Sequence, residues 1–253
     1  MLLARGLAKT YRARRLWRAE AAVGALAEVD LHVGPGETLG ILGESGSGKS
    51  TLACCIARLQ GLDKGELSLD GNDVRRLDAP ALGGRVQMIF QDPQRALNPR
   101  SKVGESLIEC ALNLGVARGV AVRRAQALLH QVGLPAAAME RYPHAFSGGQ
   151  SQRLCIARAL VSRPRLLIAD EAVSALGMSV QAQVLELLER VQQEHGLSMI
   201  FISHDLLAAA RICHRFVVMQ AGRVVEQGPV AEVYARPGHR YTQALLQATG
   251  ALA

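Results

Sequence analysis

Residues 43–51 read Gly43-Glu44-Ser45-Gly46-Ser47-Gly48-Lys49-Ser50-Thr51, and the first eight of them fit the pattern G-x-x-x-x-G-K-[ST]. An apolar strand pattern over residues 37–42 precedes them, and a helical pattern from Lys49 to about Leu59 follows. Glycines leave backbone N–H groups free to wrap a polyphosphate, and the positive end of the following helix points at it. We therefore predict that all of these residues bind nucleotide phosphates, with Lys49 bridging the β- and γ-phosphates and Ser50 binding Mg²⁺.

The composition is that of a globular protein. The chain has 253 residues, with 29 basic and 22 acidic side chains and a formal net charge of +7. Hydrophobic residues make up 49% and charged residues 20%, which is enough apolar surface for a core and too little charge for a disordered tail. The five scattered cysteines show no zinc spacing, so we expect reduced, mostly buried thiols.

Two classes of partner are disfavoured by the same composition. Aromatic residues make up only 4%, and no basic run is interleaved with them as a stacking surface for nucleic acid requires. We interpret the cluster Arg12, Arg14, Arg15 and Arg18 as a solvated loop or strand edge. No window approaches the roughly 18 consecutive apolar residues of a membrane helix, so we expect a chain without a membrane span.

Strand and helix patterns alternate along most of the chain, which predicts an α/β fold with a mixed or mostly parallel sheet. The expected strands cover residues 2–8, 26–33, 37–42, 66–69, 86–90, 166–169 and 199–202, with a hairpin at Ala221-Gly222. The expected helices cover residues 49–59, 103–114, 120–132, 136–142, 180–195 and 241–248, with one more from Gln150.

The distribution of these patterns predicts how the domain is divided. The β signal disappears between about residues 95 and 150, which indicates a helical subdomain. The core, with an N-terminal antiparallel β layer, is expected over about residues 1–94 and 151–235. Residues 236–253 are expected to form a short C-terminal helical appendage.

An acidic pair supplies the second part of a phosphate-processing site. The apolar strand that ends in Ala169 leads directly into Asp170 and Glu171. Mg²⁺ prefers hard oxygen ligands, and hydrolysis needs a positioned water. We predict that Asp170 contributes to the Mg²⁺ site and that Glu171 polarises the attacking water. P-loop folds include kinases, GTPases, helicases and transport motors, so these two elements alone leave the function open.

The segment Phe146-Ser147-Gly148-Gly149-Gln150 resembles the LSGGQ signature of ATP-binding cassette (ABC) ATPases. The chain from about Leu3 to Val225 resembles the nucleotide-binding domain of that family, with its motifs in the same order. The resemblance implies a P-loop NTPase fold with a helical signature subdomain, ATP and Mg²⁺ as cofactors, and ATP hydrolysis. It also implies that Ser147, Gly148, Gly149 and Gln150 contact nucleotide.

Three further positions match family motifs. Tyr11 falls where the family has an aromatic residue that stacks on adenine. Gln91 matches the Q-loop glutamine, which implies a catalytic role and a place among the Mg²⁺ ligands with Ser50 and Asp170. His204, in Ile202-Ser203-His204-Asp205, matches the switch histidine and is implied to be catalytic.

Four longer stretches are similar to the ATPases of dipeptide, oligopeptide and nickel importers: residues 91–100, 141–149, 179–184 and 240–246. Ala172 stands where many relatives have proline, and this variant is associated more with the nickel branch. The surrounding sequence favours the dipeptide branch. Gly177 stands where the family has an aspartate that helps link the two active sites of a dimer.

The resemblance also implies an assembly. In the family, the working unit is a head-to-tail pair of ABC ATPase subunits, so a second, identical or homologous subunit is implied here. In such a pair, the signature of one subunit covers ATP on the loop of the other. Further partners are two transmembrane permease subunits and an extracytoplasmic substrate-binding protein, without nucleic acid. The chain is accordingly expected at the cytoplasmic face of the cell membrane, as a peripheral subunit that powers peptide uptake.

Four other functions share part of this motif pattern. A nickel or metal-chelate importer ATPase of the same subfamily is the first alternative, and the variant Ala172 supports it. A subunit with weak hydrolysis beside a more active partner is kept open by Gly177. A soluble DNA-repair or translation ATPase would carry coiled coils, zinc modules or two cassettes, and a small P-loop kinase would leave the signature and His204 without a role.

Overall fold

The computed structural model describes residues 1–13, 21–174 and 176–248. Arg14, Arg15 and Arg18 of the predicted arginine cluster lie outside these residues. The chain divides into two compact units, Met1–Leu77 with Ile200–Ala253, and Asp78–Met199. The first is called the loop unit below because it contains residues 43–51, and the second is called the signature unit because it contains residues 146–150.

The loop unit contains an antiparallel sheet with strand order β2-β1-β4-β5. Its strands are β1 (Leu2–Ala13), β2 (Ala21–Val33), β4 (Lys64–Leu69) and β5 (Asn72–Asp73). Leu2 pairs with Val33 of β2 and with Leu69 of β4, and all three side chains are buried. The alternation of buried and exposed residues along β1 is that of a sheet with one covered face. The predicted antiparallel layer is confirmed.

A second set of strands in the same unit is mixed. Strand β3 (Thr38–Leu42) pairs in parallel with β9 (Arg215–Gln220), which pairs antiparallel with β10 (Arg223–Pro229). All five residues of β3 are buried, as expected for a strand covered on both faces. A Cβ at Gly40 would lie 2.7 Å from the Phe216 ring, so β3 needs glycine there to accept its neighbour. With the helices below, these strands confirm the predicted α/β fold.

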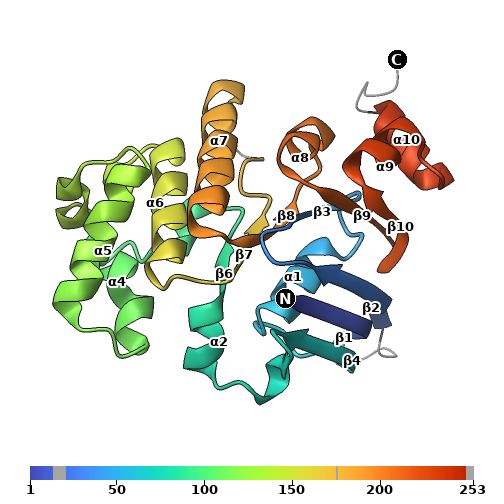
Figure 1. Cartoon of the computed structure of the whole chain (residues 1–253), viewed down its shortest axis with the longest axis horizontal. Helices are drawn as coiled ribbons and strands as arrows, with labels where there is room; N and C mark the ends of the chain where they lie inside the picture. Colours follow the sequence, from blue (N-terminus) through green and yellow to red (C-terminus); the bar gives the residue numbers. More distant parts are fainter. Residues whose placement is uncertain (14–20, 175, 249–253) are drawn as a thin grey trace. The chain divides into compact units, whose positions relative to one another are not determined.

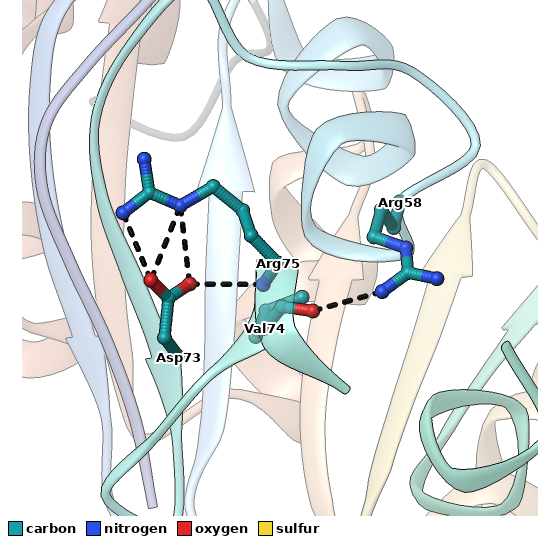
Figure 2. A network of polar contacts seen from close by, with 4 residues as sticks. All are labelled: Arg58, Asp73, Val74 and Arg75. Atoms are coloured by element: carbon teal, nitrogen blue, oxygen red, sulfur yellow. Dashed lines mark hydrogen bonds and ion pairs between the residues drawn. The ribbon is translucent and has the colours of Figure 1, made fainter. Parts of the chain in front are cut away.

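Helix α1 (Lys49–Ile56) starts directly after residues 43–48, and an arginine fixes the chain at its far end. Figure 2 shows Arg58, whose Nη1 donates to the carbonyl of Val74 at 3.1 Å. The same Nη1 also donates to the carbonyl of Leu77. Val74 begins the 3₁₀ turn η1 (Val74–Arg76), which Asp73 caps through the N–H of Arg75 at 2.9 Å. The hydrogen bonds from Arg75 hold the pKa of Asp73 below its usual range. Helix α1 is thus tied to the chain after β5.

The loop unit is completed by three short helices: α8 (Leu206–Ile212), α9 (Val230–Ala235) and α10 (Arg240–Ala248). Helix α10 lies where residues 241–248 were predicted to be helical, whereas the sequence patterns did not predict α8 and α9. Strand β8 (Ser198–Ile202) contains the boundary between the two units.

The signature unit combines a parallel pair of strands with helices. Strand β6 (Val86–Ile89) pairs in parallel with β7 (Leu166–Asp170), all of whose residues are buried. Its helices are α2 (Ala79–Arg85), α3 (Pro93–Ala96), α4 (Val103–Asn113), α5 (Arg118–Gln131), α6 (Gly148–Val161) and α7 (Met178–His195).

The helical segment predicted between about residues 95 and 150 is helical in the structure. Helices α4, α5 and α6 pack side by side (Figure 1), with Leu107 and Leu129 fully buried among the apolar side chains. The helical stretch expected over 136–142 is a 3₁₀ turn, η2 (Ala136–Glu140), and a second 3₁₀ turn, η3 (Pro143–Ala145), follows it. Tyr142 is extended, because proline at position 143 disfavours helical geometry in the residue before it. The division into core, helical subdomain and appendage stays a prediction.

Two other expectations concern the whole chain. Cys55, Cys155 and Cys213 are buried, and burial raises the pKa of Cys55 and of Cys155 to about 11, so these thiols stay protonated. Within the described ranges, no helix combines the length and apolar character needed to cross a bilayer.

Candidate nucleotide-binding site

The glycines at residues 43 and 48 are required by the way the loop packs on the sheets. Gly43 has φ +146°, and a Cβ there would lie 2.3 Å from the carbonyl oxygen of Met219. Gly48 has φ +106°, and a Cβ there would lie 2.5 Å from the carbonyl oxygen of Ala25. Residues with a side chain rarely adopt these backbone conformations, and the loop leaves no space for a Cβ atom at either position. The backbones of strands β2 and β9 therefore pack directly against the loop.

The hairpin after β9 adds a direct hydrogen bond to the loop. The N–H of Gly222 donates to the carbonyl of Ser47 at 2.9 Å, and the carbonyl of Gly222 accepts from Ala27 of β2 at 2.8 Å. Gly46, by contrast, has open space where a Cβ would lie and φ +82°. The loop is thus packed on one side and open at Gly46, which is the shape needed to admit a phosphate chain.

Lys49 is placed inside this loop. Its side chain is only 4% exposed, and its Nζ donates to the carbonyls of Gly43 and Glu44, both at 2.7 Å. A third contact joins Nζ to Ser47 Oγ at 3.4 Å. A buried ammonium is stable only where acceptors surround it, and a phosphate oxygen is a stronger acceptor than a carbonyl. The loop therefore holds a cation at the position where the predicted phosphates would bind.

The start of helix α1 also suits an anion. Its N-cap is Gly48, which has no side chain to accept the first N–H groups of the helix. Such N–H groups, together with the helix dipole, form an anion site. Ser50 follows Lys49 and is exposed, so its hydroxyl can bind a metal ion carried by the phosphates.

His204 lies next to the loop within the same unit. The N–H of Ser203 donates to the carbonyl of Ile41 at 3.4 Å, so β8 ends beside the end of β3, from which the loop leaves. Asp205 caps α8 by accepting from the N–H groups of Leu207 and Ala208, both at 3.0 Å. His204, between a strand end and a helix cap, is exposed.

Tyr11 is on β1 and is 40% exposed. Its ring lies under the ammonium of Lys9, with 5.8 Å between Nζ and the ring centroid. An exposed ring of this kind can stack on a nucleotide base, as predicted, and the nearby cation adds to the stack.

The acidic pair is assembled in the signature unit. Asp170 ends β7 and is 8% exposed, and Glu171 follows with φ +48°, a conformation that non-glycine residues rarely adopt. The hydroxyl of Ser174 donates to the carbonyl of Glu171 at 2.9 Å and holds this turn. Gln91 Nε2 donates to Glu171 Oε2 at 2.8 Å, although 80 residues separate them. Two predicted catalytic residues are therefore in contact.

The signature residues form the start of helix α6. Ser147 is the N-cap: its Oγ accepts from the N–H of Gln150 at 3.4 Å, while Gln150 Oε1 accepts from the N–H of Ser147 at 3.1 Å. This reciprocal capping box sets the direction of the helix start. A Cβ at Gly149 would lie 2.5 Å from Val180 of α7, whereas Gly148 has open space around it. Gly149 thus permits close helix packing, and Ser147, Gly148 and Gln150 are exposed.

The structure thus sorts the predicted residues into two groups. The loop unit holds residues 43–51, Tyr11 and His204, and the signature unit holds Asp170, Glu171, Gln91 and residues 147–150. Tyr241 joins the first group without any motif that predicts it: the N–H of Glu44 donates to the Tyr241 hydroxyl at 2.8 Å, across 197 residues. Only the helical period of residues 241–248 was visible in the sequence, and it does not say where that helix docks.

Comparison with known proteins agrees with this arrangement. Residues 26–174 match the sequence profile of the ABC transporter family. The chain belongs to the ABC transporter family. It is an ABC ATPase domain and binds nucleotide, as the resemblance of its motifs predicted.

Relatives and solved structures of the ABC family extend the match over most of the chain. A putative peptide import ATP-binding protein of Brucella ovis, BOV_A0347, is 45% identical over 98% of this chain and 78% of its own length. The glutathione import ATP-binding protein GsiA of Pectobacterium atrosepticum is 46% identical over 89% of this chain, which spans only 37% of GsiA. The dimeric, ADP- and phosphate-bound cassette MJ0796 has a TM-score of 0.78 and 28% identity, covering 91% of this chain and 99% of its own.

Gly177 stands where the resemblance to the family leads us to expect an aspartate. It is the N-cap of α7, with φ −64° and ψ 151°, and a Cβ there would meet nothing within 4 Å. Any residue adopts this conformation, so the glycine is not required by the backbone. An aspartate would accept hydrogen bonds from the first N–H groups of α7 and complement the helix dipole.

We expect Gly177→Asp to raise the free energy of unfolding by about 0.5 to 1 kcal/mol. Urea unfolding of the purified chain measures this change. Gly61→Asp is the matched control, because Gly61 also has open space around it but lies outside any helix start. Equal gains in both variants would mean that loss of a glycine, and not the cap, accounts for the effect.

In the assembled transporter we also expect Gly177→Asp to change the cooperativity or rate of hydrolysis.

Proposed function

We propose that this chain is the ATP-hydrolysing subunit of an importer that takes up di- or oligopeptides through separate permease subunits. The observation that carries the proposal is the buried Lys49 ammonium inside a glycine loop whose open side is Gly46. The names of BOV_A0347 and GsiA, which refer to import of peptide and of glutathione, support a peptide substrate over nickel. The solute itself would be selected by the partner chains.

The residues of the loop unit would bind and orient ATP. Lys49 has three N–H donors, of which one would keep the Gly43 carbonyl and the others would bind oxygens of the β- and γ-phosphates. The N–H groups at the start of α1 would donate to the same phosphates. Tyr11 would stack on adenine. Ser50, Asp170 and Gln91 offer a hydroxyl, a carboxylate and an amide oxygen, which are the hard ligands that suit Mg²⁺. When bound, Mg²⁺ would neutralise part of the phosphate charge.

Glu171 would act as the general base. The hydrogen bond from Gln91 Nε2 to Oε2 fixes the orientation of its carboxylate, and the turn at Glu171 sets it at the end of β7. A water that donates to this carboxylate would lose a proton to it as the water attacks the γ-phosphorus, and the bond to the β–γ bridging oxygen would break to release ADP. His204 would donate to a phosphate oxygen and stabilise the charge that develops there.

The signature would serve a second subunit. Ser147, Gly148 and Gln150 are exposed at the N-terminus of α6, a 14-residue helix whose dipole favours an anion. In a head-to-tail pair, this helix start would face the γ-phosphate on the loop of the neighbouring subunit. ATP would then favour closure of the pair, and hydrolysis would release it. The dimeric form of MJ0796 supports such a pair.

The remaining partners would be two permease subunits and an extracytoplasmic substrate-binding protein, with the chain at the cytoplasmic face of the cell membrane. Gln91 connects to the catalytic carboxylate through one hydrogen bond, so movement of the permease could reach Glu171 through it. A subunit with weak hydrolysis is the second candidate, since Gly177 lacks the carboxylate that links paired sites in the family.

The proposal is tested by uptake in a strain that lacks this chain. We expect the strain to lose uptake of labelled di- and tripeptides, and the wild-type chain to restore it. Labelled nickel and glutathione are measured in parallel to identify the solute class. Loss of nickel uptake alone would contradict the peptide assignment, and unchanged uptake of every solute would contradict the importer function. ATPase assays of the chain alone and with its permease separate an active subunit from a weak one.

A further inference from the structure

One peptide group of the phosphate loop is held at both of its ends. The peptide between Gly43 and Glu44 accepts a hydrogen bond from Lys49 Nζ at its carbonyl, at 2.7 Å. Its N–H donates to the hydroxyl of Tyr241 at 2.8 Å. Because a peptide group is planar, one contact that fixes its N–H also fixes the direction of its carbonyl. Tyr241 and Lys49 are therefore linked through a single rigid group.

Tyr241 is held in place independently of the loop. Glu226 of β10 accepts hydrogen bonds from the N–H groups of Gly238 at 2.7 Å and His239 at 3.0 Å, just before α10. His239 Nδ1 accepts from the N–H of Tyr241 at 3.2 Å. Thr242 and Leu246, one turn apart on α10, are buried. The phenol thus approaches Glu44 from a helix that is anchored on its own sheet.

The chemistry of the phenol suits this role. A tyrosine phenol is neutral at physiological pH, and burial raises the pKa of Tyr241 further above its ordinary value. A neutral hydroxyl accepts from the Glu44 N–H without placing a negative charge beside the phosphates. A bond to the N–H also polarises the same peptide and makes its carbonyl a better acceptor for Lys49.

We propose that Tyr241 is a positioning residue for the phosphate loop, through which helix α10 sets the Gly43–Glu44 peptide and thereby the Lys49 ammonium for a nucleoside triphosphate. The inference rests on the assignment of residues 43–51 as the nucleotide loop. It gives the C-terminal helix a part in nucleotide binding. A change in the docking of α10 would alter nucleotide affinity without any change in the residues that touch the phosphates.

The test replaces the phenol by a phenyl ring in the full chain. We expect Tyr241→Phe to weaken ATP binding about threefold to tenfold, the range expected when one neutral hydrogen bond is lost. Isothermal titration calorimetry with ATP measures the affinity. In the assembled transporter we expect a KM for ATP that rises by a similar factor, with kcat unchanged. Tyr234→Phe on α9 is the matched control and is expected to bind ATP like wild type.

Amide hydrogen exchange of the loop supplies a second readout that a merely structural tyrosine would not move. We expect the Glu44 N–H to be protected in wild type and in Tyr234→Phe, and to exchange faster in Tyr241→Phe. Unchanged exchange, or wild-type ATP affinity in Tyr241→Phe, would overturn the inference. Wild-type affinity in Lys49→Ala would instead overturn the assignment of the loop itself, so the two failures are distinguishable.

Discussion

Lys49→Ala is expected to lower the affinity for ATP at least about 100-fold. The side chain that is lost places a buried cation among the carbonyls of Gly43 and Glu44, where the β- and γ-phosphates would bind. Each hydrogen bond from a charged donor contributes about 1.5 to 3 kcal/mol, and two of them to phosphate oxygens account for this factor. Calorimetric titration with ATP measures the loss, and phosphate release measures the turnover that disappears with it.

Lys64→Ala is the matched control for this prediction, because Lys64 lies in the same unit on β4 and is exposed. It is expected to bind ATP as wild type does, since an exposed lysine outside the loop contributes only long-range charge. Thermal unfolding shows whether both variants remain folded. If folded Lys49→Ala kept wild-type affinity or turnover, the phosphate site would have to be sought elsewhere.

Glu171→Gln is expected to keep ATP affinity and to lose about a thousandfold in turnover. General base catalysis contributes about 10² to 10⁴ in rate, and an amide cannot take the proton of the attacking water. Glutamine has the same shape and retains an oxygen that accepts from Gln91 Nε2, so the turn after β7 should persist. Because ATP would stay intact, we also expect the variant to accumulate as an ATP-bound dimer in size-exclusion chromatography.

Glu186→Gln provides the same chemical change at an exposed position of α7 and is expected to leave turnover unchanged. Phosphate release under saturating ATP compares the two variants. Hydrolysis by Glu171→Gln at the wild-type rate would show that another group is the base. If Glu171→Gln remained monomeric at saturating ATP, the nucleotide-driven pairing would be contradicted. The role of Glu171 as the base would then be decided by the rate of hydrolysis alone.

Several elements of the fold could be predicted because their signals are local. Strand β3 was predicted from its apolar run and the glycines after it, and α7 from its helical period. Helix α2 was missed, since Gly83 and Gly84 lower its helix propensity and hide its period. Gly84 is tolerated because its missing side chain makes room for Leu114, at 2.9 Å from an added Cβ. That contact depends on tertiary packing.

The candidate site also combines residues that short motifs predict with contacts that depend on the tertiary structure. The identities of Lys49, Asp170 and Glu171 followed from short motifs, whose spacing along the chain reflects the chemistry of phosphate binding. The hydrogen bond between Gln91 and Glu171 did not follow from any motif, because parallel pairing of β6 with β7 brings together the ends of strands that are far apart in sequence. Their contact is a consequence of sheet topology.

By itself, the amino-acid sequence indicated the family through the resemblance of its motifs. It also determined many of the strands and helices and the residues of the phosphate loop, because glycine geometry and apolar period act within a few residues. Only the tertiary structure decided that Gly43 and Gly48 must lack side chains to pack against β9 and β2, and that α10 reaches the loop. Tyr241 and Glu44 meet because β10 and Glu226 anchor the last helix. Contacts over such separations depend on the packing of the whole unit, and no local pattern records them.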